Sequence, residues 1–127
     1  MQASGFEPDP YNRNCATRTI LDRIGDRWTV LVVGALREGP MRFSELSRRI
    51  DGVSQKMLTQ TLRGLERDGL VARTIFAQIP PRVEYELTAS GRSLSEPMLA
   101  LEEWTKANMP RIVTAREAYD GAHAPKA

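Results

Sequence analysis

The sequence has few of the residues from which disulfides and metal sites are built. Its 127 residues include one cysteine, Cys15, and one histidine, His123. A single cysteine excludes a disulfide within the chain, and these two residues stand near opposite ends, so no Cys and His cluster with zinc-ligand spacing exists. We therefore expect no metal and no cofactor.

Long hydrophobic runs are also missing. The longest aliphatic run, Val30 to Val33, is far below the roughly 18 residues that a membrane span needs. The opening MQASGFEPDP has neither the basic lead-in nor the apolar centre of a signal peptide. We expect a soluble, cytoplasmic protein that does not contact membranes, with one domain over residues 13–112, a flexible tail over 1–12 and a partly disordered tail over 113–127.

The sequence shows no arrangement typical of an enzyme. It contains no glycine-rich phosphate loop, and Cys15 has no histidine partner because His123 lies in the predicted tail. No pair of carboxylates stands out as an acid and base. We therefore expect a protein that is not an enzyme.

Two helices are predicted before residue 40. The first opens at Asn14, which is a good N-cap, and ends at Gly25. Asp26 can cap the second, which ends at Gly39-Pro40. Its apolar residues are predicted to form the centre of the core: Trp28, Leu31, Val32, Ala35 and Leu36.

Two further helices follow, separated by a turn at Asp51-Gly52. The short one places Phe43, Leu46 and Ile50 inward. The longer one begins after the N-cap Ser54 and ends at Asp68-Gly69. One of its faces is apolar, and the other carries Gln55, Lys56, Thr59, Gln60 and Arg63.

From residue 70 the hydrophobic period changes from that of a helix to that of a strand. Residues 70–76 and 83–87 predict two strands of a hairpin whose tip, residues 77–81, contains two prolines. Thr88 or Ser90 then caps a long helix with an apolar stripe that extends to Trp104, and the end from Tyr119 is predicted to be disordered. The order of elements indicates an α+β fold, a winged helix-turn-helix with extra N- and C-terminal helices.

The polar face of the helix after Ser54 has the residue types that read DNA. Gln55, Lys56 and Thr59 are the candidates for base contacts, and Arg63 for a phosphate contact, because the start of the second helix meets base edges in this motif. Other candidates on its borders and on the hairpin are Arg42, Ser44, Ser54, Gln60, Arg73 and Arg82. The alternative is an ordinary solvated surface. Between residues 37 and 92 there are ten Lys and Arg against seven Asp and Glu, which favours DNA only weakly.

Cys15 allows two interpretations. A position close to a helix N-terminus, with Arg13 and Arg18 nearby in the sequence, stabilises a thiolate, the reactive form. Alternatively, Cys15 is a small buried apolar residue beside Ala16. A reactive Cys15 would have to pair with another subunit, a small thiol or an electrophile.

Most of the chain, from Cys15 to about Trp104, resembles the HxlR-type transcriptional regulators, a branch of the winged helix proteins similar to the MarR group. The motifs that carry the resemblance are Asp26-Arg27-Trp28, Arg42-Phe43-Ser44-Glu45-Leu46, Ser54-Gln55-Lys56-Met57-Leu58-Thr59, Asp68-Gly69-Leu70-Val71, Val83-Glu84-Tyr85 and Leu87-Thr88. Val53 departs from the isoleucine usual in the family and keeps its aliphatic role.

The resemblance implies a homodimer, in contact through its first and last helices, that binds an inverted-repeat operator in double-stranded DNA. It also implies that Cys15 senses oxidants or electrophiles. The function expected is that of a DNA-binding transcriptional regulator, a repressor rather than an activator. The alternatives are a winged-helix regulator that responds to a non-thiol signal, and a protein-interaction module that does not bind DNA.

Overall fold

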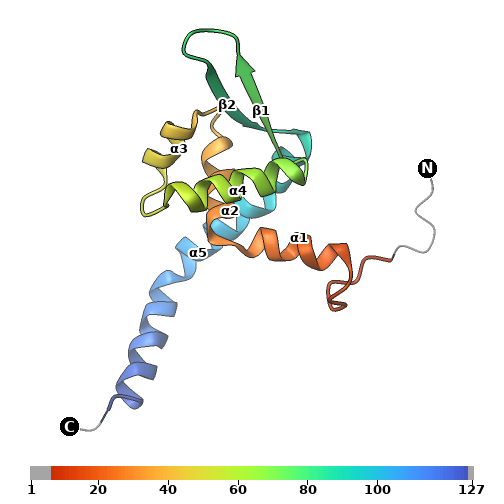
Figure 1. The fold of residues 1–127 in the computed structure, drawn as a ribbon. Helices are drawn as coiled ribbons and strands as arrows, with labels where there is room; N and C mark the ends of the chain where they lie inside the picture. The colour runs from red at the N-terminus through yellow and green to blue at the C-terminus, as the bar shows by residue number, and fades with distance from the viewer. Residues whose placement is uncertain (1–6, 126–127) are drawn as a thin grey trace. The chain divides into compact units, whose positions relative to one another are not determined.

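The computed structural model describes residues 7–125, and these form two compact units, one ending at Ser95 and one beginning at Glu96. Figure 1 shows the elements in chain order. They are α1 (Ala16–Gly25), α2 (Arg27–Leu36), α3 (Phe43–Arg49), α4 (Gln55–Arg67), β1 (Val71–Phe76), β2 (Arg82–Leu87) and α5 (Ala89–Ala122). Three helices followed by a hairpin wing form the winged helix-turn-helix that the sequence predicts, with α1 before it and α5 after it.

The core of the first unit lies between α2 and α4. Leu46, Leu58 and Leu65 are fully buried, as are Val32 and Val33. Burying such side chains is the main favourable term in folding. The core therefore fixes α4 with its apolar face inward, and this orientation leaves the opposite face of α4 outward.

Capping residues set the ends of the helices. The Asp26 carboxylate accepts hydrogen bonds from the backbone N–H groups of Trp28 and Thr29, and the Ser54 hydroxyl accepts one from Met57. Both predicted caps are confirmed. At the end of α4, Gly69 has a φ of 74°, a left-handed conformation that favours glycine, and it turns the chain into β1.

The two strands pair antiparallel and form the hairpin. Val71 lies opposite Leu87, Arg73 opposite Tyr85, and Phe76 opposite Arg82. Met41 extends the pairing by one bridge, because its N–H and carbonyl exchange hydrogen bonds of 2.9 and 2.8 Å with Tyr85. The loop before α3 is thus tied to the wing, which fixes the start of α3 beside the hairpin.

Two predictions in the first two helices are wrong, the N-cap of α1 and the burial of Leu31 in α2. The N-cap of α1 is Cys15 rather than Asn14, and no side chain caps it. None of its residues is buried. Leu31 in α2, predicted to lie in the core, is 45% exposed. Periodicity identifies the apolar face of a helix, but whether that face is covered depends on the tertiary packing.

The last helix is longer than predicted. α5 continues through Pro97 and Pro110 to Ala122, so the predicted disorder from Tyr119 is wrong as far as Ala122. Thr88 precedes α5 and its hydroxyl accepts from Gly91 N–H, so Thr88 is the cap. The predicted tails include residues 1–6 and 126–127, which lie outside the described residues. Among residues 7–125, no helix is long and apolar enough to cross a membrane.

Candidate DNA-binding interface

The outward face of α4 carries the polar residues that the sequence singles out. Gln55, Lys56, Gln60 and Arg63 are exposed, and Thr59 is half-buried. Because the hydroxyl of Ser54 accepts the Met57 N–H, it is held at the start of the helix, where it can still donate its own proton. The first turn of α4 therefore presents donors and acceptors from a rigid support.

An open cleft of about 570 Å³ lies between this face of α4 and the hairpin. It brings together four of the predicted residues, Gln55, Thr59 and Arg63 from α4 and Arg73 from β1. The other residues that line it are Phe43, Leu62, Glu66, Val83 and Tyr85. The cleft thus holds two guanidinium groups and one carboxylate among polar and apolar side chains.

The two arginines of the hairpin differ in their surroundings. Arg73 Nε lies 3.5 Å from the Glu66 carboxylate, and both side chains are about half exposed. Arg82 lies over the Phe76 ring, 4.1 Å from its centroid, and its Nε is 3.4 Å from the Glu84 carboxylate. Arg73 is thus held at the cleft, whereas Arg82 is held at the far end of the strands, next to the wing tip. The predicted place of Arg82, at the base of the wing, is therefore wrong.

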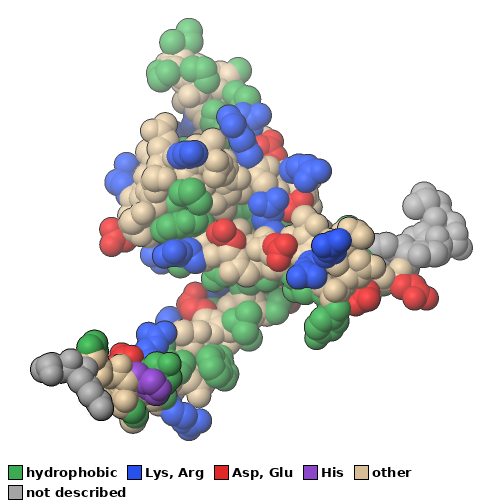
Figure 2. Space-filling model, turned by 60° about the horizontal axis from the view of Figure 1, so that its bottom comes forward, with side chains coloured by type: hydrophobic (Ala, Val, Ile, Leu, Met, Phe, Trp, Pro, Cys, Tyr) green, Lys and Arg blue, Asp and Glu red, His purple; other side chains and the backbone are tan. Residues whose placement is uncertain are grey.

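The tip of the wing is apolar. Ile79 is fully exposed, and Ile75 is 59% exposed. Figure 2 shows hydrophobic side chains gathered at the end of the hairpin, at the top of the view. Residues 77–81 at the tip therefore present apolar surface and no charged side chain to a binding partner.

The two candidates before α4 are on the surface and outside the lining of the cleft. Arg42 is the N-cap residue of α3, and its backbone N–H donates to Glu45 Oε1 at 2.8 Å. Ser44 is exposed in the first turn of α3. Of the remaining candidates, Ser54, Lys56, Gln60 and Arg82 also lie outside the cleft lining.

Five of the nine residues that line the cleft are not among the predicted site residues, and two of these, Glu66 and Tyr85, carry polar groups. Glu66 lies seven residues after Thr59, so it shares that face of the helix, and this spacing was the available signal. Tyr85 lies opposite Arg73 in the hairpin. The position of Tyr85 in the cleft follows from the register of the two strands. No local pattern in the sequence determines that register.

Cys15 is partly exposed at the start of α1, and its sulfur accepts a hydrogen bond from the Asp9 N–H at 3.4 Å. This bond, and then bonds from the Thr17 hydroxyl and N–H, lower the pKa of the thiol below its ordinary value of 9.0. Of the two predicted causes, the charges of Arg13 and Arg18 are not among those that lower the pKa, whereas the N–H of Thr17, at the N-terminus of α1, is. A lowered pKa increases the thiolate fraction at neutral pH.

Comparison with known proteins gives consistent matches. The profile of the HxlR-like helix-turn-helix family matches residues 23–113, so Cys15 lies outside the matched region. The HTH-type transcriptional regulator YtfH of Escherichia coli K12 is 43% identical over 111 residues, which cover 87% of this chain and 88% of YtfH.

Solved structures support the same relationship. YtfH from Salmonella typhimurium superposes with a TM-score of 0.82 at 41% identity, over 87% of this chain and 99% of that one. The redox regulator HypR in its oxidized form gives a TM-score of 0.69 at 40% identity, over 74% and 97%. These matches and the winged fold agree: the chain belongs to the HxlR-like helix-turn-helix family and is a transcriptional regulator with a helix-turn-helix DNA-binding domain.

Proposed function

We propose that this protein is a repressor that binds an inverted-repeat operator as a homodimer, and that modification of Cys15 changes its affinity for the operator. The observation that carries the proposal is the grouping of Gln55, Thr59 and Arg63 with Arg73 around one open cleft. In this motif the start of the second helix contacts base edges in the major groove. Gln55, Lys56 and Thr59 are the proposed base contacts.

Phosphate contacts would come from the arginines and from the borders of the reading helix. Arg63 and Arg73 flank the cleft, and Arg82 stands next to the wing tip, opposite Phe76. Arg42, Ser44, Ser54 and Gln60 supply further exposed polar groups. Such contacts fix the register of the protein on the duplex and carry no sequence information. The apolar wing tip would then follow the shape of the groove.

The homodimer is supported by apolar side chains that the single chain leaves uncovered. In the first unit, Ile20, Leu21 and Leu31 are 37%, 48% and 45% exposed. In the second unit, Leu101 and Trp104 are 60% and 58% exposed. Exposed apolar surface of this kind marks interaction sites. A dimer that binds an inverted repeat has to place its two reading helices about one DNA turn, or 34 Å, apart.

Control by Cys15 is supported by the lowered pKa of its thiol and by the similarity to HypR, a redox regulator. A change at the start of α1 would alter the dimer contact, and therefore the spacing of the two reading helices.

The test is operator selection from genomic DNA with reduced protein, followed by rebinding after treatment with diamide. We expect an inverted repeat that the oxidized protein releases, whereas the Cys15→Ser variant keeps binding it under diamide. Release by both proteins would remove Cys15 as the sensor and favour a non-thiol signal. Failure to enrich any site would remove the DNA-reading proposal and favour an interaction module.

A further inference from the structure

Arg23, in the last turn of α1, makes a bond that joins α1 to the end of α4. Its Nε donates to Asp68 Oδ2 at 2.8 Å. Asp68 is the C-cap residue of α4, and its own N–H donates to the carbonyl groups of Glu66 and Gly64. The carboxylate is therefore fixed to the last turn of the helix, and Arg23 is fixed to the carboxylate.

The guanidinium group of Arg23 also occupies a notch in the surface of α4 at Gly64. A Cβ atom at position 64 would lie 2.9 Å from Nη2 of Arg23 and closer still to Cζ and Nη1. Real Cβ atoms essentially never come within 3.0 Å of another group. Glycine inside a helix is unfavourable relative to alanine. The space that Gly64 leaves for Arg23 is a local reason for its presence.

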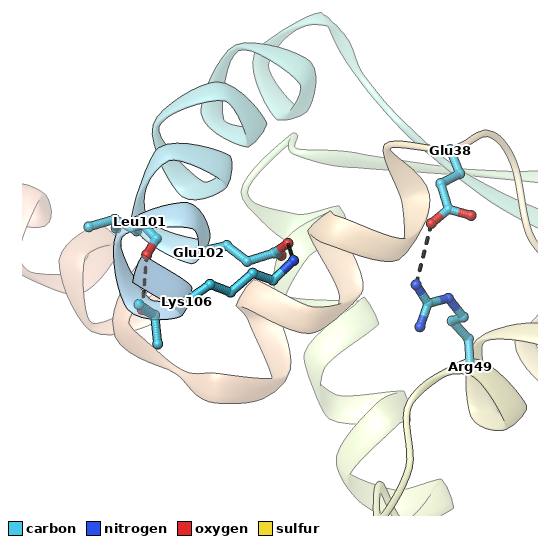
Figure 3. A network of polar contacts seen from close by, with 6 residues as sticks. Glu38, Arg49, Leu101, Glu102 and Lys106 are labelled. Carbon is cyan, nitrogen blue, oxygen red and sulfur yellow. Dashed lines mark hydrogen bonds and ion pairs between the residues drawn. The ribbon is translucent and has the colours of Figure 1, made fainter. Parts of the chain in front are cut away.

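This ion pair is more enclosed than the others in the described part of the chain. The side chains of Arg23 and Asp68 are 26% and 11% exposed. Figure 3 shows two other pairs, Arg49 with Glu38 and Lys106 with Glu102, whose side chains are 42% to 75% exposed. Exposed ion pairs contribute little stability because water and salt screen them. A partly buried pair with a short bond restricts both of its side chains.

We propose that Arg23 is a positioning residue that sets the place of the reading helix α4 relative to α1. No residue of α1 is buried, so side-chain packing in the core contributes little to fixing this helix. Arg63 directly precedes Gly64 on α4, and its side chain lines the cleft. Because α1 is proposed to take part in the dimer contact, the ion pair sets where that contact lies relative to the reading helix. The inference rests on the proposed role of α4 in DNA binding.

The first test is a double-mutant cycle with Arg23→Met, Asp68→Asn and the double variant, measured on the duplex that wild-type protein selects. We expect each single variant to bind about three- to tenfold more weakly, and the double variant to bind no more weakly than the poorer single variant, since one interaction is lost in all three. The slope of log affinity against log salt should stay unchanged, because Arg23 is not proposed to contact phosphate.

A second variant, Gly64→Ala, keeps both charges and displaces only the guanidinium group. It should weaken operator binding by a similar factor without lowering the unfolding midpoint, because alanine favours the helix. Asp22→Asn, which removes an exposed carboxylate next to Arg23, is the control matched to Asp68→Asn and should bind as wild type does.

Two results would overturn the positioning role. Wild-type affinity in all the variants would reduce the pair to a structural contact, even if the variants unfold earlier. A salt slope that falls by about 1 in Arg23→Met would make Arg23 a direct phosphate contact. If wild-type protein selects no duplex, the DNA-reading proposal fails instead, and this inference fails with it.

Discussion

The helices α1 and α4 are both amphipathic, yet they are held in opposite ways. Four residues of α4 are buried, and the hydroxyl of Ser54 caps its first turn. No residue of α1 is buried, and Cys15 stands at its N-cap without a side-chain cap bond. The helix proposed to read DNA is thus fixed by the core. The helix that follows Cys15 has no buried side chain, and the Arg23–Asp68 ion pair ties its last turn to α4.

The difference in burial between α4 and α1 predicts a large difference in stability when a leucine is removed from each helix. Leu58→Ala should lower the free energy of unfolding by about 2 to 5 kcal/mol, because it leaves a cavity in the core. Leu21→Ala in α1, whose side chain is 48% exposed, should cost under about 1 kcal/mol within one subunit. Denaturant unfolding of both variants measures the difference. Equal costs would show that the core does not distinguish the two helices.

The reading face of α4 is tested by Gln55→Ala. Losing an amide that hydrogen-bonds a base edge should weaken binding to the selected operator by about 1 to 3 kcal/mol. Binding to a scrambled duplex should change little, since that binding depends on phosphates. Fluorescence anisotropy with both duplexes gives the two affinities. An equal loss on both would move Gln55 from base reading to backbone contact.

The N-cap residues of α4 and α1, Ser54 and Cys15, can be compared by one substitution each. Ser54→Ala should cost about 1 kcal/mol of stability, because the Met57 N–H loses its acceptor. Cys15→Ala should change stability by less than about 0.5 kcal/mol, since no side chain caps α1. Thermal unfolding of both variants compares them, and a larger cost at Cys15 would mean that the thiol holds the N-terminal turn in place.

The smallest expected effect concerns the thiol itself. Thr17→Val removes a hydroxyl that lowers the pKa of Cys15, so the pKa should rise and the thiolate fraction at pH 7 should fall. Alkylation by iodoacetamide should therefore be slower at pH 7, with its rate profile moved to higher pH. Thr19→Val, on the exposed side of α1, is the control. Identical profiles would exclude the Thr17 hydroxyl as a cause.

The fold was predictable from local signals that agree with the tertiary structure. Asp26 and Ser54 cap helices in a way that their sequence positions predict, and the change of period at residue 70 marks the hairpin. These features are strong because capping, turn chemistry and hydrophobic period all indicate the same elements. The motifs that carry the family resemblance lie in these same elements.

The rest depended on contacts between distant residues. Leu31 matches a core pattern, but no element within its unit covers it. Asn14 is a better cap than Cys15 by residue type, yet the turn formed by Asp9 and Asn12 sets the helix start one residue later. The pairing of Arg23 with Asp68 spans 45 residues, and no local pattern indicates it. The grouping of Arg73 with Arg63 likewise requires the folded hairpin.

The central claim is that the exposed face of α4 binds DNA, and its most direct test is the salt dependence of operator binding. Wild-type protein, Lys56→Ala and Arg63→Ala are compared with Arg111→Ala, which removes an exposed arginine of α5. Each phosphate contact adds about 0.9 to the slope of log affinity against log salt. We predict weaker binding and a shallower slope for the Arg63 variant, weaker binding for the Lys56 variant, and no change for the Arg111 variant. Wild-type affinity and slope in both α4 variants would contradict the assignment of α4 as the DNA-binding helix.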